Sequence, residues 1–243
     1  MANHVLVERD GAFLNITFNR ARLGNLVTAP MIKSFTDAVG NVKRDGGLRA
    51  VIVRGKGKDF CLGRDPGKDK RAGGAPRSAW DVHEQVTSLI LDAYAVCRHC
   101  PVPVIAAVQG HARGFGSGIA GTCDLVLAAD SARFSTPEML HGIAPTLVMT
   151  ALQDVHRKAL ADLIYWGEPI DAQTALAIGI VSRIVTADTL DDALDALKAR
   201  LQSYDINAIQ VIKGFLGKPG HMSADALSDL ADFTLATAFT RPQ

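Results

Sequence analysis

Two loops of the sequence have the composition of backbone anion-binding sites. One holds five glycines within residues 110–121, and the other is the segment 60–65, which contains Gly63. Short helices that open from such loops present backbone N–H groups at the positive end of the helix dipole, where a developing oxyanion can be held. Each loop follows an apolar run that we expect to form a strand. The two loops therefore predict two N–H donors that converge on one ligand atom.

The glycine cluster also resembles two other motifs, and its spacing argues against both. Gly116-Ser-Gly118-Ile-Ala-Gly121 fits the dinucleotide-binding pattern G-x-G-x-x-G. That motif needs its glycines directly after the first strand and a full helix behind them. Seven residues separate Val108 from Gly116, and only about seven remain before the next strand, too few for a crossover helix. Ser117 does not form a nucleophile elbow either, because G-x-S-x-G would need glycine in place of Phe115 and Ile119.

Four further side chains have types that can do chemistry. Glu138, taken alone, is typical of a surface carboxylate, and His141 is either a second acid/base group near neutral pH or a loop histidine that binds backbone. Cys97 and Cys100 form a C-x-x-C pair, but no second pair follows at zinc-site spacing. We therefore expect the cysteines to pack in the core, and we predict no metal site.

The elements that must position these residues are predicted from periodicity and turn chemistry. Asp10-Gly11 between two alternating runs indicates a β-hairpin, and the strands and helices of the first half alternate. From Thr146 the chain is mostly helical, so the pattern is that of an α/β fold with a helical C-terminal region. The expected elements are a hairpin over 5–18, a helix over 30–45, strands at 50–54, 102–108, 125–129 and 180–185, a long loop over 56–79, and a helix over 79–100.

Composition and charge exclude several classes of protein. The chain has 243 residues, 48% of them apolar and 21% charged, with a net charge of +1. These values fit one large or two small globular domains and argue against disorder or a dedicated nucleic-acid binder. With no long apolar run and only four cysteines, we expect a cytoplasmic protein with no membrane or nucleic-acid partner.

Charge is concentrated in one place. The segment 56–77 carries seven basic residues against three acidic ones. An excess of this kind either attracts an anionic ligand or belongs to a solvated loop, and the sequence leaves both interpretations open.

Five segments, in order and at the expected spacing, resemble the crotonase superfamily, the enoyl-CoA hydratase/isomerase family. The similar segments are NRARLGNL at 19–26, FCLGRD at 60–65, PVIAAVQGHARGFG at 103–116, CDLVLAADSARF at 123–134 with Pro137-Glu138 following, and GEPIDAQTALAIGIV at 167–181. The resemblance implies a ClpP/crotonase-like spiral of ββα units. It further implies an acyl-CoA-binding core over 1–190 and a helical oligomerisation region over 191–243 that forms a homotrimer or hexamer.

The resemblance also implies roles for individual residues. The backbone N–H groups of Arg64 and Phe115 would form an oxyanion hole for the enolate of an acyl-CoA thioester, and Glu138 would be the acid/base carboxylate. No cofactor is implied apart from coenzyme A as part of the substrate. Contacts to the substrate or to CoA are implied for Arg20, Arg22, Gly63, Asp65 and Gly114.

The sequence departs from the family at one position. Members commonly use two carboxylates, and the first of these positions matches Gly118, which has no side chain. A single carboxylate favours a Δ3-Δ2 enoyl-CoA isomerase, in which one base moves a proton from C2 to C4. The alternatives are a hydratase that uses Glu138 with a substitute group such as His141, and a non-catalytic protein that binds acyl-CoA or a partner. We expect Gly118→Ala to be a harmless control for Glu138→Gln.

Overall fold

The computed structural model describes residues 4–65, 78–217 and 222–239. Its first element is the hairpin that the sequence predicts. Strand β1 (Val5–Asp10) pairs antiparallel with β2 (Phe13–Phe18), and Gly11 takes φ +56° in the turn. A positive φ of this kind is what favours glycine in a two-residue hairpin turn.

The hairpin forms one edge of a six-stranded sheet. The strand order is β1-β2-β3-β4-β6-β9, and every pair after the hairpin is parallel. The four added strands are β3 (Ala50–Gly55), β4 (Val104–Val108), β6 (Leu125–Ala129) and β9 (Arg183–Val185). All five residues of β4 are buried, as expected for a central parallel strand that is covered on both faces.

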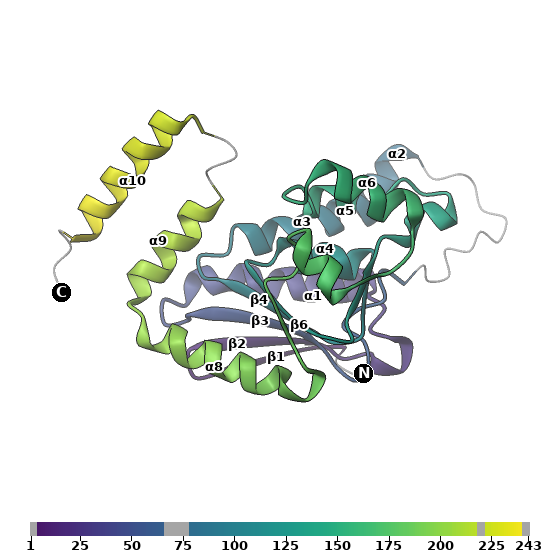
Figure 1. Cartoon of the computed structure of the whole chain (residues 1–243), viewed down its shortest axis with the longest axis horizontal. Coiled ribbons are helices and arrows are strands. Elements are labelled where there is room, and N and C mark those ends of the chain that lie inside the picture. The colour runs from purple at the N-terminus through teal and green to yellow at the C-terminus, as the bar shows by residue number, and fades with distance from the viewer. Residues whose placement is uncertain (1–3, 66–77, 218–221, 240–243) are drawn as a thin grey trace.

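Helices cover both faces of this sheet. On β3, Val51 and Val53 pack towards α1 (Ala29–Gly40), α3 (Ser88–Arg98) and α4 (Phe115–Thr122), whereas Ile52 packs towards α8 (Leu190–Ser203). Figure 1 shows α8 on the side of the sheet opposite to α1 and α3. The alternation follows from the two-residue period of a strand, and it gives the protein two apolar layers.

A small second sheet lies beyond β4 and β6. It has the order β5-β7-β8, with β5 (His111–Arg113) following β4 and β7 (Arg133–Ser135) following β6. Strand β8 (Ile170–Asp171) completes it. The run β4-β5-α4 is therefore a ββα unit, which confirms the expected crotonase-like fold class.

The remaining elements are short helices and turns. Three expectations are corrected. The helix expected over 30–45 is α1 followed by a 3-10 turn, and the helix expected over 79–100 is interrupted by a π-helical turn. A helix also fits between β4 and β6, where the sequence leaves too little room for one after the glycines. That helix, α4, fits because it starts ahead of the glycines rather than after them. The other elements are η1 (Ala21–Leu23), η2 (Asn41–Arg44), α2 (Ala79–Val82), the π turn His83–Thr87, η5 (Pro137–His141), α5 (Thr146–Ala151), α6 (Arg157–Trp166), α7 (Ala172–Ala177), η6 (Ala187–Thr189), α9 (Ile206–Leu216) and α10 (Ala224–Phe239).

The C-terminal helices extend away from the sheet. Figure 1 shows α9 leaving the end of α8 and α10 lying apart from the body of the fold. In α10, Phe233 and Leu235 are 71% and 58% exposed. An apolar surface of this kind agrees with the predicted oligomerisation region, whose trimeric or hexameric state and boundary at 190 stay predictions. No helix among the described residues has the length and apolar character needed to cross a bilayer.

One buried ion pair attaches α9 to the core. The Nζ of Lys213 lies 2.8 Å from both carboxylate oxygens of Asp124 and donates to the carbonyl of Cys97 at 3.0 Å. Asp124 also accepts from the N–H of Val104 at 2.7 Å. The pair therefore joins α9 to the end of α3 and to the start of two central strands.

Candidate active site

The two predicted N–H loops lie side by side. Cys61 donates its N–H to the carbonyl of His111 at 3.0 Å, and Arg113 donates to the carbonyl of Cys61 at 2.9 Å. A Cβ on Gly63, whose φ is +108°, would be 3.3 Å from the carbonyl oxygen of Arg113. The segment 60–65 therefore runs along β5 and brings Gly63 close to Gly114, although the two are far apart in sequence.

The backbone N–H of Arg64 points away from Val27, the residue that lies beside it in a parallel bridge. Val27 donates its N–H to Gly63 at 2.9 Å, and Asp65 donates to the carbonyl of Val27 at 2.8 Å. In a parallel bridge of this register, the residues that flank Arg64 make the bonds to Val27. The N–H of Arg64 therefore points to the opposite edge, which is the side of β5.

Phe115 is the first residue of α4. Its preceding residue, Gly114, has φ +49° and donates to the carbonyl of Ser135 at 2.9 Å. The first intrahelical bond runs from Gly118 to Gly114, at 2.9 Å. The N–H of Phe115 thus belongs to the first turn, whose N–H groups have no acceptor within the helix and lie at its positive end.

Glu138 places a carboxylate against this helix start. It is the second residue of η5, and a Cβ on Gly114 would lie only 2.5 Å from its Oε1. Its Oε2 is buried and finds no hydrogen-bond partner among the described residues. Burial raises the pKa of Glu138, and a backbone hydrogen bond and the charge of Arg113 oppose the rise. A half-buried carboxylate with a raised pKa is typical of a general base.

A network of polar side chains fixes the loop that carries Arg64. Asn25 is fully buried with φ +55°, and its side chain accepts from the N–H of Arg20 at 2.8 Å and donates to the carbonyls of Lys56 and Asp59 at 3.0 and 2.7 Å. The guanidinium of Arg20 binds Asp65 at 2.5 Å. Both Arg20 and Asp65 therefore brace the loop, and their contacts to CoA stay predictions.

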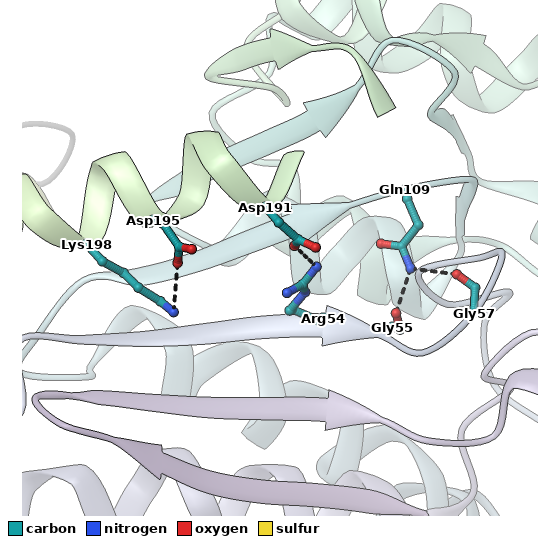
Figure 2. Close-up of polar contacts among 7 residues, drawn as sticks. All are labelled: Arg54, Gly55, Gly57, Gln109, Asp191, Asp195 and Lys198. Carbon is teal, nitrogen blue, oxygen red and sulfur yellow. Dashed lines mark hydrogen bonds and ion pairs between the residues drawn. The ribbon is translucent and has the colours of Figure 1, made fainter. Parts of the chain in front are cut away.

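The turn after β3 is held from its other side by Gln109. Figure 2 shows its amide directed at Gly55 and Gly57, to whose carbonyls it donates at 2.6 and 3.1 Å. The same view shows Arg54 of β3 paired with Asp191 of α8. These residues line a pocket of about 390 Å³ that contains none of the predicted site residues. The pocket is a separate feature, and Gln109 serves to fix the start of the segment 60–65.

The remaining candidates are exposed, buried in the core, or outside the described residues. Arg22 is exposed on η1, and His141 is exposed at the end of η5, three residues after Glu138. Cys97 and Cys100 are buried in the core, as expected. The described part of the chain contains no cluster of three His, Cys, Asp or Glu side chains suited to a metal. Most of the basic segment 56–77 lies outside the described residues.

The structure corrects the expectation for Gly118. The three glycines of the G-x-G-x-x-G pattern lie inside α4, where a Cβ on Gly118 would be 2.1 Å from the hydroxyl of Tyr94 on α3. Gly118→Ala is therefore not a harmless control, because Tyr94 would have to move. Sequence reasoning missed Tyr94, which reads as one apolar position of a buried helix face.

Comparisons with known proteins agree with this geometry. The family model described as "Enoyl-CoA hydratase/isomerase" matches residues 8–236. A probable enoyl-CoA hydratase of Mycobacterium leprae is 30% identical over 200 residues, which cover 82% of this chain and 75% of the relative. The crystal structure of an enoyl-CoA hydratase from Mycobacterium smegmatis superposes with a TM-score of 0.91 at 26% identity, covering 99% and 93% of the two chains. A putative enoyl-CoA hydratase from Thermobifida fusca, solved in complex with CoA, gives 0.87 at 25% identity, covering 97% and 93%.

Proposed function

Because the chain belongs to the enoyl-CoA hydratase/isomerase family, and is therefore an enzyme of crotonase type, we propose that it is an enoyl-CoA isomerase that moves a double bond from C3 to C2 of an acyl-CoA. The observation that carries the proposal is that Glu138 supplies a carboxylate at the start of α4 while Gly118, the other position at which the family commonly has one, supplies none. The carboxylate lies at the start of α4, and the next turn of the helix contributes no second carboxylate.

The backbone stabilises the charge that develops on the substrate. In the proposed reaction the thioester oxygen accepts hydrogen bonds from the N–H groups of Arg64 and Phe115. When the C2–H bond breaks, its electron pair delocalises through the C3–C4 double bond and the thioester, forming a dienolate. One donor of this kind stabilises the transition state by about 2.7–4 kcal/mol. The braces from Asn25 and Gln109 support the proposal because they fix one donor loop before substrate binds.

Glu138 carries the proton. Its carboxylate takes the proton from C2 and returns it to C4, so that the carboxylate is regenerated and no oxidant or reductant is needed. A raised pKa suits both halves of this shuttle, because the group must gain and lose a proton near neutral pH. Since the ionised form starts the cycle, activity falls as the pH drops through the raised pKa of Glu138.

Binding of the CoA part is assigned to the outer surface beside the same loop. The exposed guanidinium of Arg22 lies on η1, directly after the braced residue Arg20 and its neighbour. An exposed cation there suits the phosphates of CoA. We expect Arg22→Ala to raise KM several-fold with little effect on kcat, because in this assignment Arg22 contacts the CoA phosphates and not the reacting carbons.

Hydration is the second candidate function, favoured by the names of the relatives. In that reaction Glu138 would activate a water for addition at C3 and then protonate C2, with His141 or a substrate-held water in support. The exposed position of His141 weakens this alternative, because a group that holds the reacting water has to face the acyl chain.

Two substrates distinguish the candidate functions. Isomerisation of a 3-enoyl-CoA creates the conjugated enoyl chromophore, whereas hydration of crotonyl-CoA destroys it. We expect the first activity to dominate and Glu138→Gln to lower it at least a hundredfold, together with deuterium exchange at C2. Glu8→Gln, an exposed carboxylate on β1, is the matched control. Exchange at C2 that survives in Glu138→Gln would contradict the assignment of the base.

A further inference from the structure

Tyr94 of α3 packs against the start of α4, the helix that carries Phe115 and Gly118. Its side chain is 1% exposed, on α3, and its ring stacks on that of Phe115 with centroids 5.8 Å apart and planes at 24°. Phe115 is the residue whose N–H opens α4. The Tyr94 ring therefore rests against the first turn of the helix that holds the proposed oxyanion.

The hydroxyl of Tyr94 lies where a side chain at position 118 would project. A Cβ on Gly118 would be 2.1 Å from the hydroxyl, 2.4 Å from Cζ and 2.7 Å from Cε1. Gly114, which contacts Glu138, is one helical turn earlier. The N-terminal part of α4 thus meets two groups in succession, the Glu138 carboxylate at 114 and the Tyr94 phenol at 118.

The phenol side chain of Tyr94 is uncharged. Burial raises the pKa of Tyr94, and the negative charge of Glu138 raises it further, so the hydroxyl stays protonated. A protonated phenol cannot accept a proton from water, and its ring excludes water from the volume it fills.

We propose that Tyr94 is the residue that determines which reaction the site performs. By filling the space beside Gly118, it leaves no room near the acyl carbons for a water that Glu138 could activate, so that proton transfer by Glu138 is the reaction that remains. The inference rests on the proposed isomerase function and extends it from the base to the control of water.

The test measures selectivity rather than activity alone. Tyr94→Leu keeps an apolar side chain in the core but vacates the space beside Gly118, whereas Tyr94→Phe keeps the ring and removes one oxygen. We expect the ratio of crotonyl-CoA hydration to 3-enoyl-CoA isomerisation to rise at least tenfold in Tyr94→Leu and to stay within threefold in Tyr94→Phe. A purely structural role would lower both activities together and leave the ratio unchanged.

A second pair of variants tests the contact itself. Gly118→Glu has no room in the wild-type chain, but in the Tyr94→Leu background it gains space and adds a second carboxylate. We expect it to abolish isomerisation in the first background and to raise hydration in the second, a coupling that independent sites do not show.

The outcomes separate the two proposals. An unchanged ratio in Tyr94→Leu, an equal rise in Tyr94→Phe, or equal damage by Gly118→Glu in both backgrounds overturns the role of Tyr94. Wild-type protein that hydrates crotonyl-CoA and does not isomerise a 3-enoyl-CoA overturns the proposed function instead. Circular dichroism of each variant establishes that the fold is retained before its ratio is read.

Discussion

Replacing Lys213 by Met is the sharpest test of how the C-terminal helices are attached. The side chain of Lys213 is 4% exposed and that of its partner Asp124 is 15% exposed. The substitution keeps the apolar stem and removes three hydrogen bonds, at 2.8, 2.8 and 3.0 Å. It leaves the carboxylate of Asp124 largely buried and without its counter-ion.

The magnitude follows from that stranded charge. Removing one partner of a buried ion pair costs about 3–5 kcal/mol, and the partial exposure of Asp124 places this pair at the lower end. A loss of about 3 kcal/mol corresponds to a fall in Tm of roughly 6–12 °C for a domain of this length. Lys33→Met is the matched control, because Lys33 pairs with Asp37 at 2.8 Å while both side chains are more than half exposed. Such a pair contributes about 0.3–0.5 kcal/mol.

The assay is thermal and urea unfolding of both variants at one protein concentration and pH. Adding Asp124→Asn to Lys213→Met should recover much of the loss, because the amide oxygen still accepts the N–H of Val104 and no charge remains buried. The reasoning is wrong if Lys213→Met and Lys33→Met lose the same stability, or if the double variant is less stable than Lys213→Met alone.

Three further predictions concern the site. The pKa of Glu138 is raised in the folded state, so folding disfavours its ionised form. Glu138→Gln should therefore be more stable than wild type at pH 7. The gain should vanish below about pH 4, where the carboxyl is protonated in both states, and unfolding curves measured across pH test this. Gly114→Ala should lose most isomerase activity while Gly11→Ala keeps it. Both positions have positive φ, but only at position 114 would the added Cβ lie 2.5 Å from a carboxylate oxygen, that of Glu138. Equal activity in the two variants would argue against the position of Glu138. Asn25→Ala should lower the free energy of unfolding in urea by about 3 kcal/mol and raise KM. Two carbonyls lose their donor, and alanine is strained at φ +55°. A loss of stability below about 1 kcal/mol would show that Asn25 does not brace the loop.

Patterns of short range were read correctly from the sequence. The hairpin follows from Asp10-Gly11, and the buried face of α1 follows from the helical spacing of Ile32, Phe35 and Val39. Both depend on residues within a few positions of each other. The expectations that no helix fits between β4 and β6 and that Gly118→Ala is harmless are wrong. The glycines serve close packing inside α4, and that need depends on Tyr94 and other residues of neighbouring elements.

Contacts of long range needed the structure. Lys213 reads as a polar position on an amphipathic helix, and only the packing of α9 against the ends of α3 and β6 shows that it is buried with Asp124, 89 residues away. The stacking of Tyr94 on Phe115 is of the same kind. The resemblance to a family located Arg64 and Phe115, but the braces from Asn25 and Gln109 are set by tertiary geometry.

The parallel topology also governs when the site can come into being as the chain folds. Arg20 and Asn25 follow the hairpin, the segment 60–65 follows β3, and Glu138 follows β7, so the cluster forms only after strands distant in sequence have paired. Pairings of this kind close long loops and are slow. A partly folded chain that holds the hairpin and α1 would bind no thioester. The return of isomerase activity on refolding should therefore lag behind the return of helical circular dichroism. The length of this lag measures how long the parallel sheet takes to close.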